Sequence, residues 1–292
     1  MHEGEVPIDA QLVGRLVGDQ FPAWSDQTLD RVDSGGTVNA IYRLGAELSV
    51  RLPLADWGVE SLEREFSWAP RLAPHLPLEV PRPLVRGVPA HGYPFPWSIH
   101  RWIDGTIAIP EHIEDARTAA VEIAGFVRAL QAIDTAGAPE NTHRGGPLVP
   151  ADWSTRTAIR ACQGLIDTTA MLEVWERALA APPWDGPVVW THGDLWYTNL
   201  LAVDGRITAV LDFGGIGVGD PAIDTLPAWS LCDVTSRPFF RSVLGVDDAT
   251  WERGKGWAVS MAAQALPYYL DTNSIIVDNA RRMIEQLLTD AT

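Results

Sequence analysis

The chain has 292 residues, of which 46% are hydrophobic and 21% are charged. This is ordinary globular usage, and it excludes a collagen-like, coiled-coil or disordered chain. The length fits one large domain or two packed lobes. The formal net charge of -16 opposes nucleic acid or an anionic membrane surface as a partner, because either requires a basic face. Cationic small molecules, or a polyanion bound together with a metal ion, fit this charge better.

The two cysteines, Cys162 and Cys232, are too few for a disulfide framework and have no C-x-x-C spacing. A reducing cytoplasm is therefore the expected compartment. The first seven residues carry Glu3 and Glu5 and lack the apolar segment of a signal peptide, and no run of 18 apolar residues occurs in the sequence. The sequence predicts neither a targeting segment nor a membrane anchor.

The first hundred residues predict a small sheet with one main helix. A short helix is expected over residues 13–23, then a glycine turn over 33–37, and then two strands over 39–44 and 47–52 that form a hairpin around Gly45. Apolar residues at helical spacing predict a helix over 59–73. The following stretch is rich in proline and has room only for short strands, such as 97–103. We place a lobe boundary near Asp104 and Gly105.

The rest of the chain is expected to be mainly helical. An apolar face recurs along residues 116–130, and a second helical segment extends from 152 to about 179. Strands over 188–190 and 207–211 flank a loop with many polar residues. Residues 221–288 are predicted to be helical, with interruptions at Pro227, Pro238 and Pro267.

The polar loop contains the spacing of a kinase catalytic loop. Asp194 stands five residues before Asn199, and Asp212 begins an Asp-Phe-Gly sequence after the next strand. In kinases such an Asp accepts the proton of the substrate hydroxyl, while the Asn and the second Asp hold magnesium. Each residue alone could simply cap a surface turn. The ordered combination favours phosphoryl transfer.

The His-Gly-Asp sequence at 192–194 and the Gly-Asp-Pro-Ala-Ile-Asp sequence at 219–224 resemble the aminoglycoside phosphotransferase family, the antibiotic kinases related to protein kinases. The resemblance implies an α+β, bilobal, protein-kinase-like fold. Its small antiparallel-sheet N-lobe, residues 1–104, would bind the nucleotide. Its larger, mainly helical C-lobe, residues 105–292, would carry catalysis and the acceptor, with the nucleotide in the cleft between the lobes. His192, Asp220 and Asp224 are expected to brace this region and not to bind metal.

The resemblance also implies nucleotide-binding residues in the N-lobe. Arg51 stands where the family usually has a lysine that touches the phosphates, and Glu65 fits its helix partner. Each of these two could also be an ordinary surface charge. Trp102 is a candidate for contact with the base, although packing explains it equally well. The candidates for the glycine-rich phosphate loop are Ser34, Gly35, Gly36 and Thr37.

Together these residues imply a Mg²⁺-dependent kinase that uses ATP or GTP to phosphorylate a hydroxyl of a small molecule. Asp194 would orient the hydroxyl, and Asn199 and Asp212 would hold the metal. The expected acceptor is an antibiotic such as an aminoglycoside or a macrolide. A kinase of a hydroxylated metabolite is the first alternative, and a catalytically weak nucleotide-binding module, suggested by Arg51, is the second.

Overall fold

The computed structural model describes residues 5–32, 36, 38–141 and 144–290. It separates into two compact units. Unit 1 comprises Met1–Pro74, Glu79–Asp104 and Asp212–Gly214, and unit 2 comprises His75–Leu78, Gly105–Leu211 and Gly215–Thr292. The short Asp-Phe-Gly segment is thus grouped with the N-terminal residues, although it lies far along the sequence.

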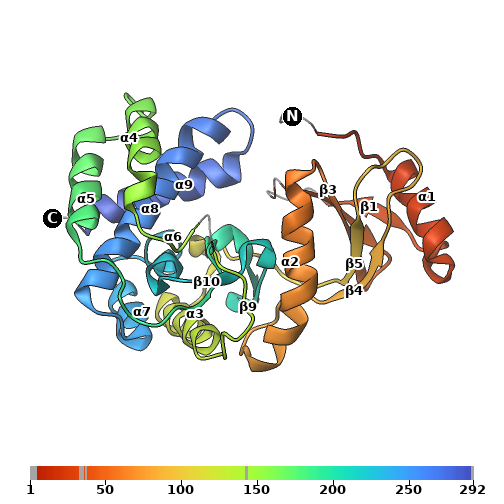
Figure 1. Cartoon of the computed structure of the whole chain (residues 1–292), viewed down its shortest axis with the longest axis horizontal. Coiled ribbons are helices and arrows are strands. Elements are labelled where there is room, and N and C mark those ends of the chain that lie inside the picture. Colours follow the sequence, from red (N-terminus) through yellow and green to blue (C-terminus); the bar gives the residue numbers. More distant parts are fainter. Residues whose placement is uncertain (1–4, 33–35, 37, 142–143, 291–292) are drawn as a thin grey trace. The chain divides into compact units, whose positions relative to one another are not determined.

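Unit 1 is built on a five-stranded antiparallel sheet with strand order β1-β2-β3-β5-β4. Two helices, α1 (Ala10–Gln20) and α2 (Trp57–Leu72), lie on opposite faces of this sheet (Figure 1). The predicted hairpin is present, and its turn contains Gly45 with φ at 60°, a left-handed conformation that glycine adopts without steric cost. The strands are β1 (Leu29–Arg31), β2 (Asn39–Leu44), β3 (Leu48–Pro53), β4 (Pro83–Gly87) and β5 (Trp97–Arg101).

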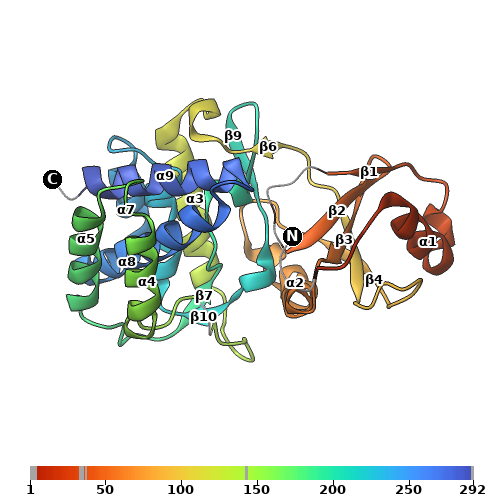
Figure 2. The ribbon, with the colours of Figure 1, turned by 90° about the horizontal axis from the view of Figure 1, so that it is seen from above.

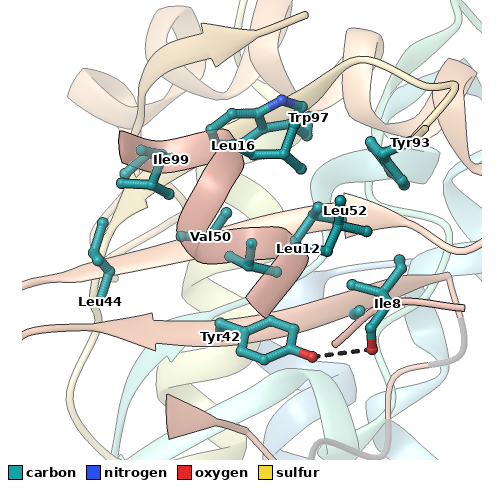
Figure 3. Packing of buried hydrophobic residues seen from close by; sticks show 13 residues of the cluster. Ile8, Leu12, Leu16, Tyr42, Leu44, Val50, Leu52, Tyr93, Trp97 and Ile99 are labelled. Carbon is teal, nitrogen blue, oxygen red and sulfur yellow. Dashed lines mark hydrogen bonds between the residues drawn. The ribbon is translucent and has the colours of Figure 1, made fainter. Parts of the chain in front are cut away.

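Alternation along the strands sorts the side chains between the two faces. Val50 and Leu52 on β3, and Ile99 on β5, point into an apolar core with residues of α1 such as Leu16 (Figure 3). Because side chains alternate with period two, Arg51 and His100 lie on the other face, where α2 packs. The Tyr42 hydroxyl closes the core by donating to the backbone oxygen of Ile8 at 3.1 Å.

Unit 2 is mainly helical. Its longest helix, α8, packs against α4, α5 and α9, while α3 packs against α7; Figure 2 shows α4 and α5 side by side. The buried Thr155 and Ser260 hydroxyls join α4 to α8 at 2.8 Å. The helices are α3 (Ala116–Gln131), α4 (Asp152–Ala161), α5 (Thr168–Ala180), α6 (Pro227–Ser230), α7 (Arg237–Leu244), α8 (Asp248–Tyr269) and α9 (Ser274–Thr289).

Two small antiparallel sheets in unit 2 position its polar loops. One has the order β6-β8-β9 and the other pairs β7 with β10. A 3-10 turn, η5 (Tyr197–Asn199), leads directly into β8. The strands are β6 (Thr106–Ile107), β7 (Val189–Thr191), β8 (Leu200–Val203), β9 (Arg206–Val210) and β10 (Gly217–Gly219). The fold class is the predicted α+β.

The structure corrects two expectations about helices. The segment from 152 to 179 is two helices, because Gly164 turns the chain with φ at 84° and Asp167 caps the start of α5. Pro227 and Pro238 lie in the first turn of helices and do not interrupt them. A proline is tolerated there because the N–H groups of the first turn have no hydrogen-bond acceptor within the helix. Pro267 lies inside α8, near its end.

Among the residues that the structure describes, no helix is both long and apolar enough to span a membrane.

Candidate active site

The loop after β7 is braced by its own histidine. The His192 ring contacts the backbone oxygen of Leu211 through Nε2 at 2.8 Å and accepts from the Asp194 backbone N–H through Nδ1 at 3.2 Å. Between them, Gly193 has φ at 78°, and a Cβ there would lie 2.8 Å from the Asn141 amide nitrogen. Only glycine fits this position without displacing a neighbour. His192 therefore has the bracing role expected from the sequence.

Asp194 and Asn199 are in direct contact. The Asn199 amide nitrogen donates to the Asp194 backbone oxygen at 2.9 Å and to the Asp194 carboxylate Oδ2 at 3.1 Å. These two bonds define the orientation of the amide, so the Asn199 Oδ1 faces away from Asp194. The Asp194 side chain keeps 27% of its surface exposed. A carboxylate that can reach solvent thus lies beside an amide oxygen suited to a hard cation.

Asp224 fixes the backbone of the loop by hydrogen bonds. Its carboxylate is fully buried and accepts from the backbone N–H groups of His192 at 2.8 Å and Gly193 at 2.9 Å. Burial raises the pKa of Asp224 above its usual value, against the lowering effect of these neighbours. Asp220 caps the following turn through the Ala222 N–H at 2.9 Å. Both aspartates are therefore structural, as expected.

A cation from a distant part of the chain contacts the loop. The Arg144 guanidinium donates through Nη1 to the Asp194 carboxylate and, at 3.4 Å, to the Gly193 backbone oxygen. Asn141 fixes the start of this segment, because its side chain accepts from the Arg144 backbone N–H at 3.0 Å and donates to Thr191 at 3.2 Å. Sequence reasoning missed both residues, since they lie about 50 positions before the loop and belong to no motif that we recognised.

The end of the loop is tied to the C-terminal helix. The Tyr197 backbone N–H donates to the Ser230 hydroxyl at 2.7 Å, and that hydroxyl donates to the Asn279 side chain on α9 at 2.9 Å. Burial raises the pKa of Tyr197 to about 12, and the carboxylates of Asp278 and Glu111 act in the same direction. The surroundings of Tyr197 therefore include two negative charges and the positive charge of Arg282, which acts in the opposite direction.

In unit 1, Arg51 and Glu65 form the ion pair that the sequence predicted. The Arg51 Nη1 lies 2.7 Å from the Glu65 Oε1, and the two side chains are 16% and 8% exposed. They are not the solvated surface charges of the alternative interpretation. His100, only 2% exposed, lies beside the pair with its Nδ1 3.5 Å from Glu65 and its Nε2 2.8 Å from the Ser98 hydroxyl. Burial, and then the positive charge of Arg51, lower the pKa of His100 well below its usual value.

Asp212 has an unusual backbone conformation. Its φ is 60°, a left-handed value that Asp adopts more readily than most residues and that is common at functional sites. The next residue, Phe213, donates its backbone N–H to the Glu65 Oε2 at 2.9 Å. Glu65 therefore links the Arg51 strand to the Asp-Phe-Gly segment within unit 1.

Asn199 and Asp212 each carry an oxygen donor of the kind that magnesium prefers. Asn199, in unit 2, has an amide oxygen, and Asp212, in unit 1, has a carboxylate. Within the described residues, no three His, Cys, Asp or Glu side chains gather into a metal-binding group.

The other predicted nucleotide residues are placed as follows. Trp102 follows β5; its indole N–H donates to Asp104 at 3.0 Å, and the Arg43 guanidinium lies 4.6 Å from its ring centroid. Gly36 is exposed. The remaining predicted residues of the phosphate loop, Ser34, Gly35 and Thr37, lie outside the described residues.

Comparisons with known proteins identify a family for this chain. The profile of the phosphotransferase enzyme family, APH, matches residues 31–257. A search of curated proteins finds no match. The GDP and kanamycin complex of APH(2")-IIIa superposes with a TM-score of 0.71 at 18% identity, covering 96% of this chain and 99% of that one.

Two other solved structures are also similar. The streptomycin and ATP ternary complex of APH(2")-IIa gives a TM-score of 0.60 at 16% identity, with 96% and 97% of the two chains covered. The macrolide 2'-phosphotransferase MphH from Brachybacterium faecium gives 0.63 at 21% identity, with 95% and 98% covered. These likenesses show the kinase-like fold. Because the family profile covers most of its length, this chain belongs to the phosphotransferase enzyme family.

Proposed function

We propose that this protein transfers the γ-phosphoryl group of ATP or GTP to a hydroxyl of a small antibiotic. The observation that carries the proposal is the contact of Asp194 with Asn199, in which one amide donates to both the backbone and the carboxylate of the same aspartate. This arrangement holds a proton acceptor and a metal-binding oxygen at a fixed separation, which is the main requirement of phosphoryl transfer.

In this reaction the acceptor oxygen forms a bond to the γ-phosphorus, and the bond between that phosphorus and the β–γ bridging oxygen breaks. The hydroxyl proton goes to the Asp194 carboxylate, and the nucleoside diphosphate leaves. Arg51 would contact the phosphates, with Glu65 fixing its direction, while the segment at 34–37 and Trp102 would cover the phosphates and the base. Mg²⁺ held by Asn199 and Asp212 would neutralise the charge of the triphosphate.

The net charge of the chain favours a cationic acceptor. The whole chain carries a net charge of -16. At Tyr197, which lies between Asp194 and Asn199, the two carboxylates of Asp278 and Glu111 act against the single positive charge of Arg282. An aminoglycoside with several amines would gain more from such surroundings than a neutral metabolite. The solved relatives include complexes with kanamycin and streptomycin and a macrolide 2'-phosphotransferase, so both antibiotic classes are candidates.

The test is a substrate screen with a matched inactive variant. Aminoglycosides, macrolides and hydroxylated metabolites are incubated with Mg-ATP or Mg-GTP, and release of the diphosphate and the mass of the phosphorylated product are measured. We expect transfer to at least one antibiotic, and we expect Asp194→Asn to lower kcat by about 10² or more without changing nucleotide affinity. Nearly unchanged turnover in Asp194→Asn would place the proton acceptor elsewhere.

The two alternatives give different results in the same screen. A metabolite kinase would phosphorylate a sugar or an amino alcohol and no antibiotic. A nucleotide-binding module would bind Mg-ATP or Mg-GTP and release no diphosphate with any acceptor. The contact between Asp194 and Asn199 argues against the second alternative, because a binding module does not require it.

A further inference from the structure

Arg144 contacts Asp194, but the proposed reaction gives Arg144 no role. Arg144 is 44% exposed, and its guanidinium contacts the carboxylate Oδ1, while Asn199 holds the other oxygen, Oδ2. The two oxygens of Asp194 are therefore held by different donors, one 50 residues before it and one five residues after it. A carboxylate fixed at both oxygens has one rotamer, whereas a carboxylate fixed at one oxygen can turn about its side-chain bonds.

The segment that carries Arg144 is itself held in place. The Asn141 backbone N–H donates to Val218 on β10 at 3.0 Å, and its side chain donates to the Thr191 hydroxyl and to the Gly215 backbone oxygen at 3.3 Å. The backbone oxygen of Gly145 accepts from the Asp220 N–H at 2.7 Å. Asn141 and Gly145, on either side of Arg144, are thus bonded to β10 and to Asp220.

We propose that Arg144 is a positioning residue for phosphoryl transfer: it holds the Asp194 carboxylate in the orientation that meets the acceptor hydroxyl. The inference rests on the proposed function of Asp194. Both described contacts of the Arg144 guanidinium use Nη1, one to the Asp194 carboxylate and one to the Gly193 backbone oxygen. An arginine suits this task because each terminal nitrogen carries two N–H donors in the fixed plane of the group, so the bond to Gly193 helps to set the direction of the bond to Asp194.

The experiment compares Arg144→Gln, Arg144→Lys and a control, Arg206→Gln. Arg206 also pairs with a carboxylate, that of Glu122, but it lies on β9 and is 63% exposed. With an acceptor identified in the screen, we expect Arg144→Gln to lower kcat about 10- to 100-fold, in the range for a misplaced catalytic group. The KM for nucleotide should be unchanged, Arg144→Lys should recover part of the loss, and Arg206→Gln should behave as wild type.

A double-mutant cycle separates positioning from loop stability. If Arg144 acts through Asp194, adding Arg144→Gln to Asp194→Asn causes no further loss. An equal loss in both backgrounds, or wild-type kcat in Arg144→Gln, would overturn the inference. Failure of the wild type to phosphorylate any acceptor would instead refute the proposed function. Even without an acceptor, crystal structures of the wild type and Arg144→Gln test the positioning role. An Asp194 carboxylate with the same orientation in both proteins would contradict that role.

Discussion

The buried His100 ring should make the stability of this protein depend on pH. Its folded-state pKa is lowered well below 6.5 by burial and by Arg51, and the charge of the neighbouring Glu65 is already balanced by Arg51. In the unfolded chain the ring binds a proton below about pH 6.5, whereas the folded protein excludes it. The unfolded state therefore binds more protons, and stability from this group is present above pH 6.5 and lost as the pH falls.

The size of the effect follows from the unfolded pKa of 6.5. If the folded protein takes up no proton at His100, linkage lowers the free energy of unfolding by about 0.8 kcal/mol at pH 6 and by about 2 kcal/mol at pH 5. These are upper values, because any proton that His100 takes up in the folded protein reduces the difference between the two states. His100→Gln keeps a group that can reach the Ser98 hydroxyl but cannot titrate. The variant should therefore lose less stability than wild type between pH 7.5 and pH 5.

The assay is urea unfolding followed by tryptophan fluorescence at several pH values, with the free energy of unfolding taken at each. His75→Gln is the control, because His75 is exposed and its replacement should leave the pH dependence as in wild type. The quantity compared is the change with pH, so a constant loss of stability from the substitution does not matter. Parallel pH curves for wild type and His100→Gln would refute the reasoning.

Three further outcomes are expected. Calorimetry should show that the wild type binds nucleotide more tightly with Mg²⁺ than without it, and that Asp212→Ala removes this difference. If wild type and Asp212→Ala each bound nucleotide equally well with and without Mg²⁺, the metal assignment would be wrong. Arg51→Ala should weaken nucleotide binding about 10- to 100-fold, as for the loss of a hydrogen bond from a charged group. The control Arg86→Ala, which removes an exposed ion pair, should leave nucleotide affinity unchanged. Wild-type nucleotide affinity in Arg51→Ala would exclude a phosphate contact by Arg51. The thiols of Cys162 and Cys232 are buried, and burial raises the pKa of Cys232 to about 12, so a thiol reagent at pH 8 should react only after unfolding in urea; rapid reaction of the native protein would disprove this.

Local patterns in the sequence predicted most of unit 1 and the order of elements in unit 2. The hairpin, the helix that carries Glu65 and the helix over Ala116–Gln131 each have a strong period or turn signal, and each is present. The break at Gly164 was missed because an apolar helical pattern continues on both sides of it. A single glycine inside such a pattern does not reveal whether the backbone will adopt a positive φ.

In the candidate site, too, some residues could be predicted from the sequence and others could not. Asp194, Asn199 and Asp212 could be proposed from the sequence because kinase chemistry fixes the spacing of such residues along the chain. Arg144 and His100 were missed because their relation to the site is spatial. Arg144 reaches Asp194 from about 50 residues away, and His100 reaches Glu65 only because β5 pairs with β3. Neither contact leaves a periodic signal in one sequence.

The relay from Tyr197 through Ser230 to Asn279 has a consequence for the nascent chain. The candidate catalytic loop gains this link to α9 only when Asn279 has been added, about 80 residues after the loop itself. At about 5–20 residues per second, the ribosome needs roughly 4–16 s to add that stretch. During this interval the nascent chain already contains Asp194 and Asn199 but lacks the helix that holds the end of their loop. We therefore expect phosphotransferase activity to arise only after α9 has been synthesised and has packed against the rest of unit 2.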